Sequence, residues 1–257
     1  MCLIFLSYKQ NEEYPFIALA NRDEFYKRPT LPADYWEENQ NILAGKDLEG
    51  GGTWMGVTKN GHMAMLTNYR DIPNIKQNAP TRGKLVSDYL KGEFDAKNYL
   101  LALTKTASLY NGYNLIAGTF DDPWYFSNYE KQKVVQLGSG FYGLSNQLLD
   151  SNWPKIEKGK ARLASLMLDK ELDIKALFSV MSDKEVVEND ALLPSTGLPL
   201  DRERAISSMF IDTEGYGTRA TTLVAVHRSG EVTFIERLFE NGKFAGVENQ
   251  YKFRLRK

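Results

Sequence analysis

The sequence has few of the residues that build disulfide frameworks and transition-metal sites, and it has no long apolar run. It contains one cysteine, Cys2, and two histidines, His62 and His227. A single cysteine excludes an internal disulfide framework. So few thiol and imidazole ligands also argue against a transition-metal site. No apolar run approaches the roughly 18 to 20 residues that a membrane-spanning helix needs.

The sequence also has no large excess of positive or negative charge. The 32 Lys and Arg residues nearly cancel the 33 Asp and Glu residues, so no overall field would attract nucleic acid or anionic lipid. The N-terminus has no basic leader and carries a charge by Lys9, so no signal peptide is expected. We therefore expect a cytoplasmic protein with no nucleic-acid partner and no stable membrane insertion. Its oligomeric state is not indicated.

Two short apolar segments at the N-terminus predict a β-hairpin. Residues 1–8 and 16–20 are rich in β-forming side chains, and residues 9–15 between them are polar. The second segment runs into Asn21-Arg22-Asp23-Glu24, so the hairpin brings this tetrad beside the start of the chain. The first strand shows no polar alternation until its end, which indicates that both of its faces are covered.

The remaining pattern alternates between strands and helices. Asn60-Gly61 between residues 54–57 and 62–69 is a strong hairpin signal, whereas residues 25–35, with Pro29 and Pro32, are expected to be irregular. Helical spacing predicts helices over 82–91, 95–109, 154–166, 173–181 and 203–210, and further strands over 114–119, 124–127, 134–137, 141–144, 219–226, 231–237 and 250–253. We expect one α+β domain spanning residues 1–257, a four-layer α-β-β-α sandwich of two mainly antiparallel sheets with the first strand central.

Cys2 follows the initiator methionine directly. Removal of Met1 would leave one residue with both a thiol and a free α-amine, whose unperturbed pKa near 8 lets it serve as a base at neutral pH. A nearby arginine would favour the thiolate because a cation stabilises the charged form. The alternative is a small buried hydrophobic residue without chemistry, the usual state of a lone cysteine in an apolar strand.

Two asparagines, Asn68 and Asn146, fall at the ends of predicted strands, as the tetrad does. A nucleophile needs donors aimed where negative charge develops on the attacked carbonyl, and one amide or backbone N–H donor is worth roughly 3 kcal/mol. Strand-end asparagines more commonly satisfy turns, so both interpretations stay open at this point.

Several motifs resemble the NRDE family, also called transport and Golgi organisation 2. They are the tetrad after Met1-Cys2, residues 46–57 (KDLEGGGTWMGV), residues 67–70 (TNYR) and residues 216–222 (YGTRATT). The resemblance covers essentially the whole chain and implies the fold of N-terminal nucleophile hydrolases. More distantly, the pattern is similar to choloylglycine hydrolases and penicillin V acylases, which cleave amides with an N-terminal cysteine.

The resemblance implies roles for four residues. Cys2 corresponds to the nucleophile, Arg22 to the arginine beside it, Asn68 to the oxyanion-hole asparagine and Asn146 to a second active-site asparagine. A late arginine is also expected, and Arg219 or Arg204 can fill this place.

Two neighbouring acids are candidates for orienting the amine. Those hydrolases have an aspartate three residues after the arginine, where this chain has Phe25. Here the acids are Asp23 and Glu24, which point to opposite faces of a regular strand. Parity places Glu24 on the side of Arg22, provided the strand is still regular there. Substrate contacts are expected from Asn21, Trp54 and Tyr69.

Three functions follow from these features. The first is a cysteine amidohydrolase that cleaves the C–N bond of a small, non-peptide amide substrate without a cofactor. The second, which the resemblance also implies, is a non-catalytic intracellular carrier or chaperone that binds haem or an acyl lipid in the same pocket. Neither histidine lies in a recognisable haem motif, so Cys2 would be the axial thiolate. The third is a structural interaction module.

Overall fold

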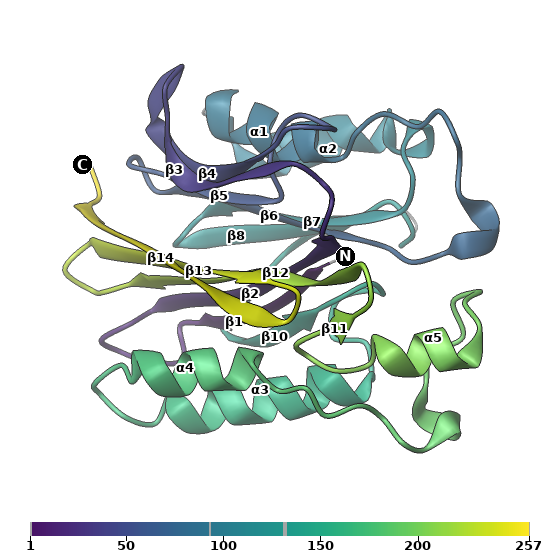
Figure 1. The fold of residues 1–257 in the computed structure, drawn as a ribbon. Coiled ribbons are helices and arrows are strands. Elements are labelled where there is room, and N and C mark those ends of the chain that lie inside the picture. Colours follow the sequence, from purple (N-terminus) through teal and green to yellow (C-terminus); the bar gives the residue numbers. More distant parts are fainter. Residues whose placement is uncertain (1, 93, 131–132, 257) are drawn as a thin grey trace.

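The structure, a computed structural model, describes residues 2–92, 94–130 and 133–256. Met1, whose removal the proposed chemistry requires, lies outside this range. The chain forms four stacked layers, with helices, two seven-stranded antiparallel sheets and further helices following one another (Figure 1). This confirms the predicted α+β sandwich.

The lower sheet in Figure 1 carries the N-terminal hairpin. Its strand order is β10-β1-β2-β12-β13-β14, with the short β11 paired to β12. The bounds are β1 (Cys2–Tyr8), β2 (Phe16–Phe25), β10 (Gly140–Leu144), β11 (Asp212–Thr213), β12 (Tyr216–Val226), β13 (Glu231–Glu240) and β14 (Lys243–Arg254). The expectation that β1 is central is wrong: it is the second strand of the order, and β2 and β12 lie in the middle.

The upper sheet is a continuous antiparallel meander in sequence order from β3 to β9. It contains the predicted hairpin around Asn60-Gly61. The bounds are β3 (Thr30–Trp36), β4 (Asn39–Asp47), β5 (Met55–Thr58), β6 (His62–Asn68), β7 (Tyr113–Thr119), β8 (Asp122–Ser127) and β9 (Val134–Gln136).

Helices cover the outer face of each sheet (Figure 1). The α-helices are α1 (Gly83–Gly92) and α2 (Ala96–Thr104) above, and α3 (Pro154–Leu166), α4 (Ile174–Met181) and α5 (Leu200–Ala205) below. Short 3-10 turns are η1 (Ile72–Asn74), η2 (Ala107–Leu109) and η3 (Asp190–Leu192). Asp95 and Asp173 cap α2 and α4 by accepting the backbone N–H groups of Asn98 and Ala176.

Three apolar clusters fill the spaces between the layers. Alternation along β1 sends Ile4 and Leu6 into the cluster between the sheets and Leu3 and Phe5 into the cluster between the lower sheet and helices α3 and α4. A third cluster joins the upper sheet to α1 and α2. Both faces of β1 are therefore covered, as its unbroken apolar run predicts. Cys2 shares the parity of Ile4 and faces the space between the sheets.

Some boundaries differ from the sequence prediction. Residues 30–36 form β3 rather than an irregular loop, because an edge strand tolerates a proline whose missing N–H needs no ladder partner. Strand β4 begins with polar residues, so the sequence pattern does not predict it. Helix α5 covers residues 200–205, earlier than the predicted 203–210, and Ile206 to Ile211 pack as an irregular buried segment.

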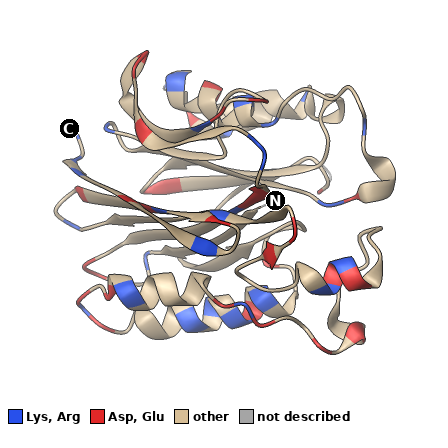
Figure 2. Cartoon of the chain, viewed as in Figure 1, with Lys and Arg blue, Asp and Glu red and all other residues tan. Residues whose placement is uncertain are grey.

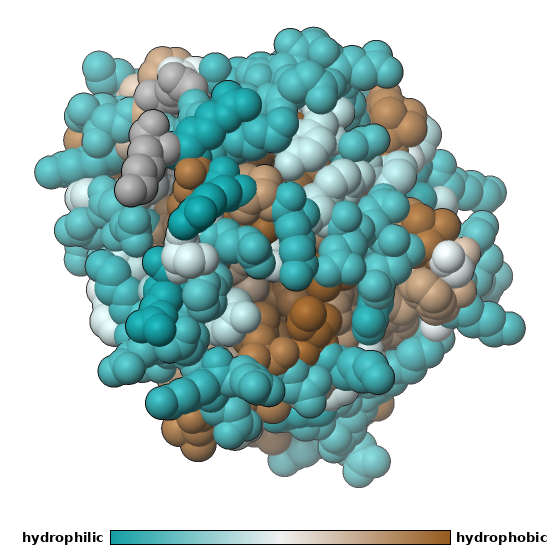
Figure 3. Space-filling view, turned by 90° about the vertical axis from the view of Figure 1, so that its left-hand side faces the viewer, coloured by the Kyte–Doolittle hydropathy of each residue, from teal (hydrophilic) through white to brown (hydrophobic). Residues whose placement is uncertain are grey.

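Charged residues of both signs are intermixed over the layers (Figure 2). The side of the molecule opposite α5 and η1 is largely hydrophilic, with a hydrophobic area in its centre (Figure 3). None of the helices in the described residues is long and apolar enough to cross a bilayer.

Candidate functional site

Cys2 and Arg22 face each other across the first hairpin. They are directly opposed in the β1–β2 register, so their side chains leave the sheet on the same side. That side is the space between the two sheets, and both residues line a cavity of about 260 Å³. The sequence prediction that the hairpin brings Arg22 to the thiol is therefore confirmed.

Arg22 is held from several directions. Its guanidinium lies 4.2 Å from the ring centre of Trp54, and its Nη2 lies 3.7 Å from Oδ2 of Asp47. Asp47 is shared with Arg28, whose Nε donates to the same oxygen over 2.8 Å. These contacts fix the orientation of the cation that faces the thiol. Trp54 thus lines the predicted site, with its ring against the guanidinium of Arg22.

The Cys2 thiol is buried, and burial raises its pKa above the ordinary value. The neighbouring carboxylates of Asp23 and Glu24 raise this pKa further, whereas Arg22 lowers it. Because burial is the largest influence, the thiol is protonated at neutral pH. A nucleophilic attack from this position needs a base that takes the proton as the new bond forms.

The two acids of the tetrad both reach the Cys2 cavity. Parity on a regular strand assigns Glu24 alone to the side of Arg22, whereas here Asp23 lines the cavity as well. Asp23 is almost fully buried, and its Oδ1 accepts a hydrogen bond from Oγ1 of Thr218 over 2.7 Å. Burial raises the pKa of Asp23 to about 6. The ladder is irregular here, because the β2–β12 register shifts between Thr218 and Ala220.

Asn68 and Asn146 come together at the same end of the sandwich. Asn68 ends β6 and lines the Cys2 cavity. The side-chain Nδ2 of Asn146 donates to the backbone carbonyl of Asn68 over 2.9 Å. Asn146 therefore supports the residue beside the cavity, and one of its amide hydrogens is already used there.

Arg82, just before α1, is a site residue that the sequence prediction missed. It lines the Cys2 cavity, and its Nη1 donates to the carbonyl of Gly112 over 2.8 Å. Burial lowers its pKa, while Glu24 and Cys2 raise it. An arginine at a helix start carries no sequence signal for a site 80 residues away along the chain, so only the fold reveals it.

A larger cavity of about 810 Å³ adjoins the Cys2 cavity. The two share Glu24, Asn68, Arg82 and Asn111 in their walls. Apolar side chains from three separate segments line the larger cavity, including Phe25, Ile72, Ile75, Leu198 and Ile206. The site therefore joins a polar chamber holding the thiol to an apolar chamber that can take a hydrophobic group.

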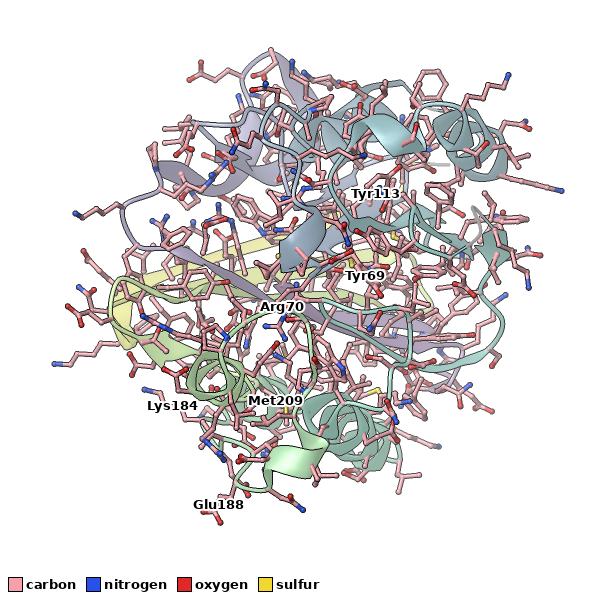
Figure 4. All side chains as sticks on the ribbon, turned by 90° about the vertical axis from the view of Figure 1, so that its right-hand side faces the viewer. Tyr69, Arg70, Tyr113, Lys184, Glu188 and Met209 are labelled. Atoms are coloured by element: carbon pink, nitrogen blue, oxygen red, sulfur yellow. The ribbon has the colours of Figure 1, made fainter. Side chains whose placement is uncertain are left out.

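Tyr69 and Arg70 belong to the walls of this larger cavity. Figure 4 labels both at this end of the molecule, between the upper and lower layers. Tyr69 stacks on Tyr129 with ring centres 3.9 Å apart. Arg70 forms a buried ion pair with Glu203 of α5, with Nη2 and Oε2 2.9 Å apart. Tyr69 thus lines the site at the apolar chamber, away from Cys2.

Besides Tyr69 and Asn146, three predicted residues lie outside the lining of the Cys2 cavity. Asn21 is fully buried and faces the lower helices, where its Nδ2 donates to the carbonyls of Met181 and Met209. A substrate contact from Asn21 is therefore wrong, because strand alternation turns it away. Arg219 lines a separate cavity beside Arg22, and Arg204 binds the carbonyls of residues 187 and 188 and the carboxylate of Asp190.

The residues that line the large cavity are not suited to act as an axial ligand of haem iron. Its lining includes neither histidine, cysteine nor methionine. Three tyrosines line it, but burial raises the pKa of each, most strongly that of Tyr216, which disfavours a tyrosinate ligand. Within the described residues, no group of three or more His, Cys, Asp or Glu side chains is arranged to hold a metal ion.

The fold has counterparts among solved structures. The C2A mutant of conjugated bile acid hydrolase from Clostridium perfringens aligns with a TM-score of 0.50 and 9% identity, over 99% of this chain and 97% of that one. A Caenorhabditis elegans N-acylethanolamine-hydrolyzing acid amidase ortholog aligns with a TM-score of 0.50 and 12% identity, over 86% and 92% of the chains. The architecture is that of the N-terminal nucleophile hydrolases.

Sequence comparison places the chain more closely. It belongs to the Transport and Golgi organisation 2 family, whose profile matches residues 1–241. It is 35% identical to the human Transport and Golgi organization protein 2 homolog over 99% of both chains. It is 26% identical to the Drosophila melanogaster protein of that name over 92% of this chain and 91% of the other.

Proposed function

We propose that the protein is an N-terminal cysteine amidohydrolase that cleaves a small, non-peptide amide with an apolar acyl group. The observation that carries this proposal is the placement of Cys2 opposite Arg22 in a polar cavity that adjoins a large apolar one. Removal of Met1 supplies the α-amine that the buried thiol needs as a base.

In the first half of the reaction, Sγ of Cys2 attacks the amide carbonyl carbon while the α-amine of Cys2 takes the thiol proton. The carbonyl oxygen becomes an oxyanion, and the side-chain amide of Asn68 donates a hydrogen bond to it. The C–N bond then breaks, and the α-ammonium gives its proton to the departing amine. The acyl group remains on sulfur as a thioester.

In the second half, water attacks the thioester carbonyl carbon and gives a proton to the α-amine. The C–S bond breaks and the acid leaves, after which the proton returns to the thiolate of Cys2. Arg22 stabilises negative charge on sulfur in both halves, because Trp54 and Asp47 hold its guanidinium beside the thiol. The acyl chain lies in the apolar cavity, and the amine leaves from the polar one.

The test uses protein whose intact mass shows that Met1 is absent, with the decanoyl amide of aminomethylcoumarin as substrate. We expect coumarin release and a transient decanoyl adduct on Cys2. Cys2→Ser should lower turnover by at least about 100-fold, and an uncleaved N-terminal tag, which blocks the amine without changing the thiol, should do the same. Full turnover by either form, or Met1 retained on soluble native protein, overturns the proposal.

A second candidate is non-catalytic carriage of an acyl lipid, favoured by the 810 Å³ apolar cavity itself. The donors there favour an acyl chain over haem. The test is binding of the fluorescent fatty acid cis-parinaric acid. Ala205→Trp fills this cavity from α5 and should weaken binding at least tenfold, while Cys2→Ser should leave it unchanged. Binding by Met1-free protein without amide turnover would favour carriage, whereas binding that survives Ala205→Trp would exclude this cavity.

A further inference from the structure

A second polar cavity lies beyond Arg22, on the side away from Cys2. Its volume is about 250 Å³. Arg22 and Trp54 line both this cavity and the Cys2 cavity, so they form the partition between the two. We name it the Glu236 cavity, after the buried acid in its wall.

The sheet register explains why space is left here. Cys2, Arg22, Ala220 and Leu238 stand opposite one another along four neighbouring strands. The small side chain of Ala220 follows the large one of Arg22 in this row. Strand β3 of the other sheet covers the space with Leu31 and Pro32. The gap between the sheets above Ala220 is therefore not filled by the core.

Glu236 presents a buried carboxylate to this cavity. The residue is 1% exposed, and its Oε2 accepts the backbone N–H of Ala33 over 2.6 Å. Burial raises its pKa to about 7, although Arg22 and the bond to Ala33 lower it. Among the described residues, no cationic nitrogen lies within 4.0 Å of this carboxylate. Burying a carboxylate without a cationic partner is costly.

Arg219 presents the opposite charge to the same cavity. Its Nη1 donates to the backbone carbonyls of Phe25 and Arg28. Burial lowers its pKa and the nearby guanidinium of Arg22 lowers it further, whereas the carboxylates of Glu24, Glu240 and Asp47 raise it. Within the described part of the chain, no carboxylate lies within ion-pair distance of Arg219. Arg22 and Glu240 also line the cavity, and no ion pair joins Glu236 to Arg219 within the described residues.

We propose that the Glu236 cavity is a binding site for a small α-amino acid, with its ammonium group on Glu236 and its carboxylate on Arg219. A zwitterion satisfies both charges at once, whereas an anion leaves the buried carboxylate unpaired and a cation leaves the guanidinium unpaired. Leu238, Phe239 and Ala245 also line the cavity and suit a short apolar side chain. The site is distinct from the Cys2 cavity and does not depend on the proposed hydrolysis.

The test is calorimetric titration of the full chain with L-alanine, acetate and methylammonium chloride. We expect L-alanine to bind at millimolar concentration or below, and each single-charge analogue to bind at least tenfold more weakly. Glu236→Gln, which keeps an acceptor for the N–H of Ala33, should weaken L-alanine binding at least tenfold. Ala220→Val, which narrows the cavity, should do the same.

Two controls make the result decisive. Glu231→Gln changes an exposed acid on the same strand, and Cys2→Ser changes the other cavity, so both should bind L-alanine as the unmodified protein does. Absence of binding at millimolar L-alanine overturns the proposal. Equal affinity for acetate, unchanged binding by folded Glu236→Gln protein, or a loss of binding in Cys2→Ser also overturns it.

Discussion

Asn146 donates its side-chain N–H to the backbone carbonyl of Asn68 over 2.9 Å, and its own carbonyl accepts the N–H of Arg70 over 2.8 Å. Asn68 ends β6 in the upper sheet, and Asn146 follows β10 in the lower sheet. This pair of hydrogen bonds therefore joins the two sheets at the end where Cys2 lies. These two hydrogen bonds fix the position of Asn68 relative to the Cys2 thiol.

The two asparagines should consequently respond differently to substitution. Asn68→Ala removes a donor to the oxyanion and should lower kcat of the proposed hydrolysis by roughly 100-fold to 1,000-fold with little change in KM. Asn146→Ala removes a support and should lower the free energy of unfolding by about 1 kcal/mol, with a smaller loss of kcat. Steady-state kinetics and urea unfolding of both variants separate these effects. A larger kcat loss in Asn146→Ala would reverse the assignment.

Arg22 should control the reactivity of the Cys2 thiol. Arg22→Gln removes the cation that lowers the pKa of the thiol and leaves burial and the two carboxylates, which raise it. We therefore expect slower alkylation by iodoacetamide at pH 7 to 8, by roughly tenfold. The measurement is the pH dependence of the alkylation rate in Met1-free protein. The control is Arg28→Gln. Arg28 also binds Asp47, but it does not lie opposite Cys2 in the strand register.

The strands that form the site can be predicted from the sequence, but not all of the residues that line it. Hydrophobic runs and Asn60-Gly61 predict both hairpins because strand pattern and turn chemistry are local properties. The parity argument for Glu24 requires a regular strand, but the β2–β12 register shifts at this point, and both Asp23 and Glu24 reach the Cys2 cavity. By the same alternation, Asn21 faces the lower helices. Local pattern is therefore a sound guide to direction wherever the strand is regular.

What the sequence could not supply depends on contacts between distant segments. The Glu236 cavity and the large cavity form where residues far apart in the chain meet, and the same is true of the place of Arg82 in the Cys2 cavity. Strand β3 was missed because Pro32 is read as a breaker unless the strand is known to lie at an edge. The position of an edge is a property of the sheet, so it follows only from the complete topology.

Glu236 should give the protein a distinctive pH dependence of stability. Its folded pKa is raised from 4.5 to about 7, so the native state holds a proton that the unfolded chain has lost between these values. Stability should therefore fall as pH rises from about 4.5 to about 7, by up to about 3 kcal/mol, and level off above. Glu236→Gln should lose the part of this fall that Glu236 causes, keep the part caused by Asp23, whose pKa is raised to about 6, and be the more stable protein at pH 8. Urea unfolding across this range, without added amino acids, measures it; parallel curves would contradict the assignment.

The buried pair of Arg70 and Glu203 should show strong energetic coupling. Their side chains are only 5% and 2% exposed. Oε1 of Glu203 also accepts the backbone N–H of Thr196 over 3.0 Å, so the pair ties α5 and the wall of the large cavity to the segment after Asn68. Arg70→Met leaves a buried carboxylate without its cation and should cost about 3 to 5 kcal/mol of unfolding free energy.

Glu203→Gln removes the carboxylate that pairs with Arg70 and should cost a similar amount, because the remaining charge stays buried in each case. The double variant Arg70→Met/Glu203→Gln buries no unpaired charge from this pair. It should therefore be more stable than the sum of the single losses predicts, with a coupling energy above about 1 kcal/mol. Urea unfolding of all four proteins at pH 7 completes the cycle. Additive losses would mean that the two charges are stabilised by other neighbours, and that the wall of the large cavity is held by packing rather than by this ion pair.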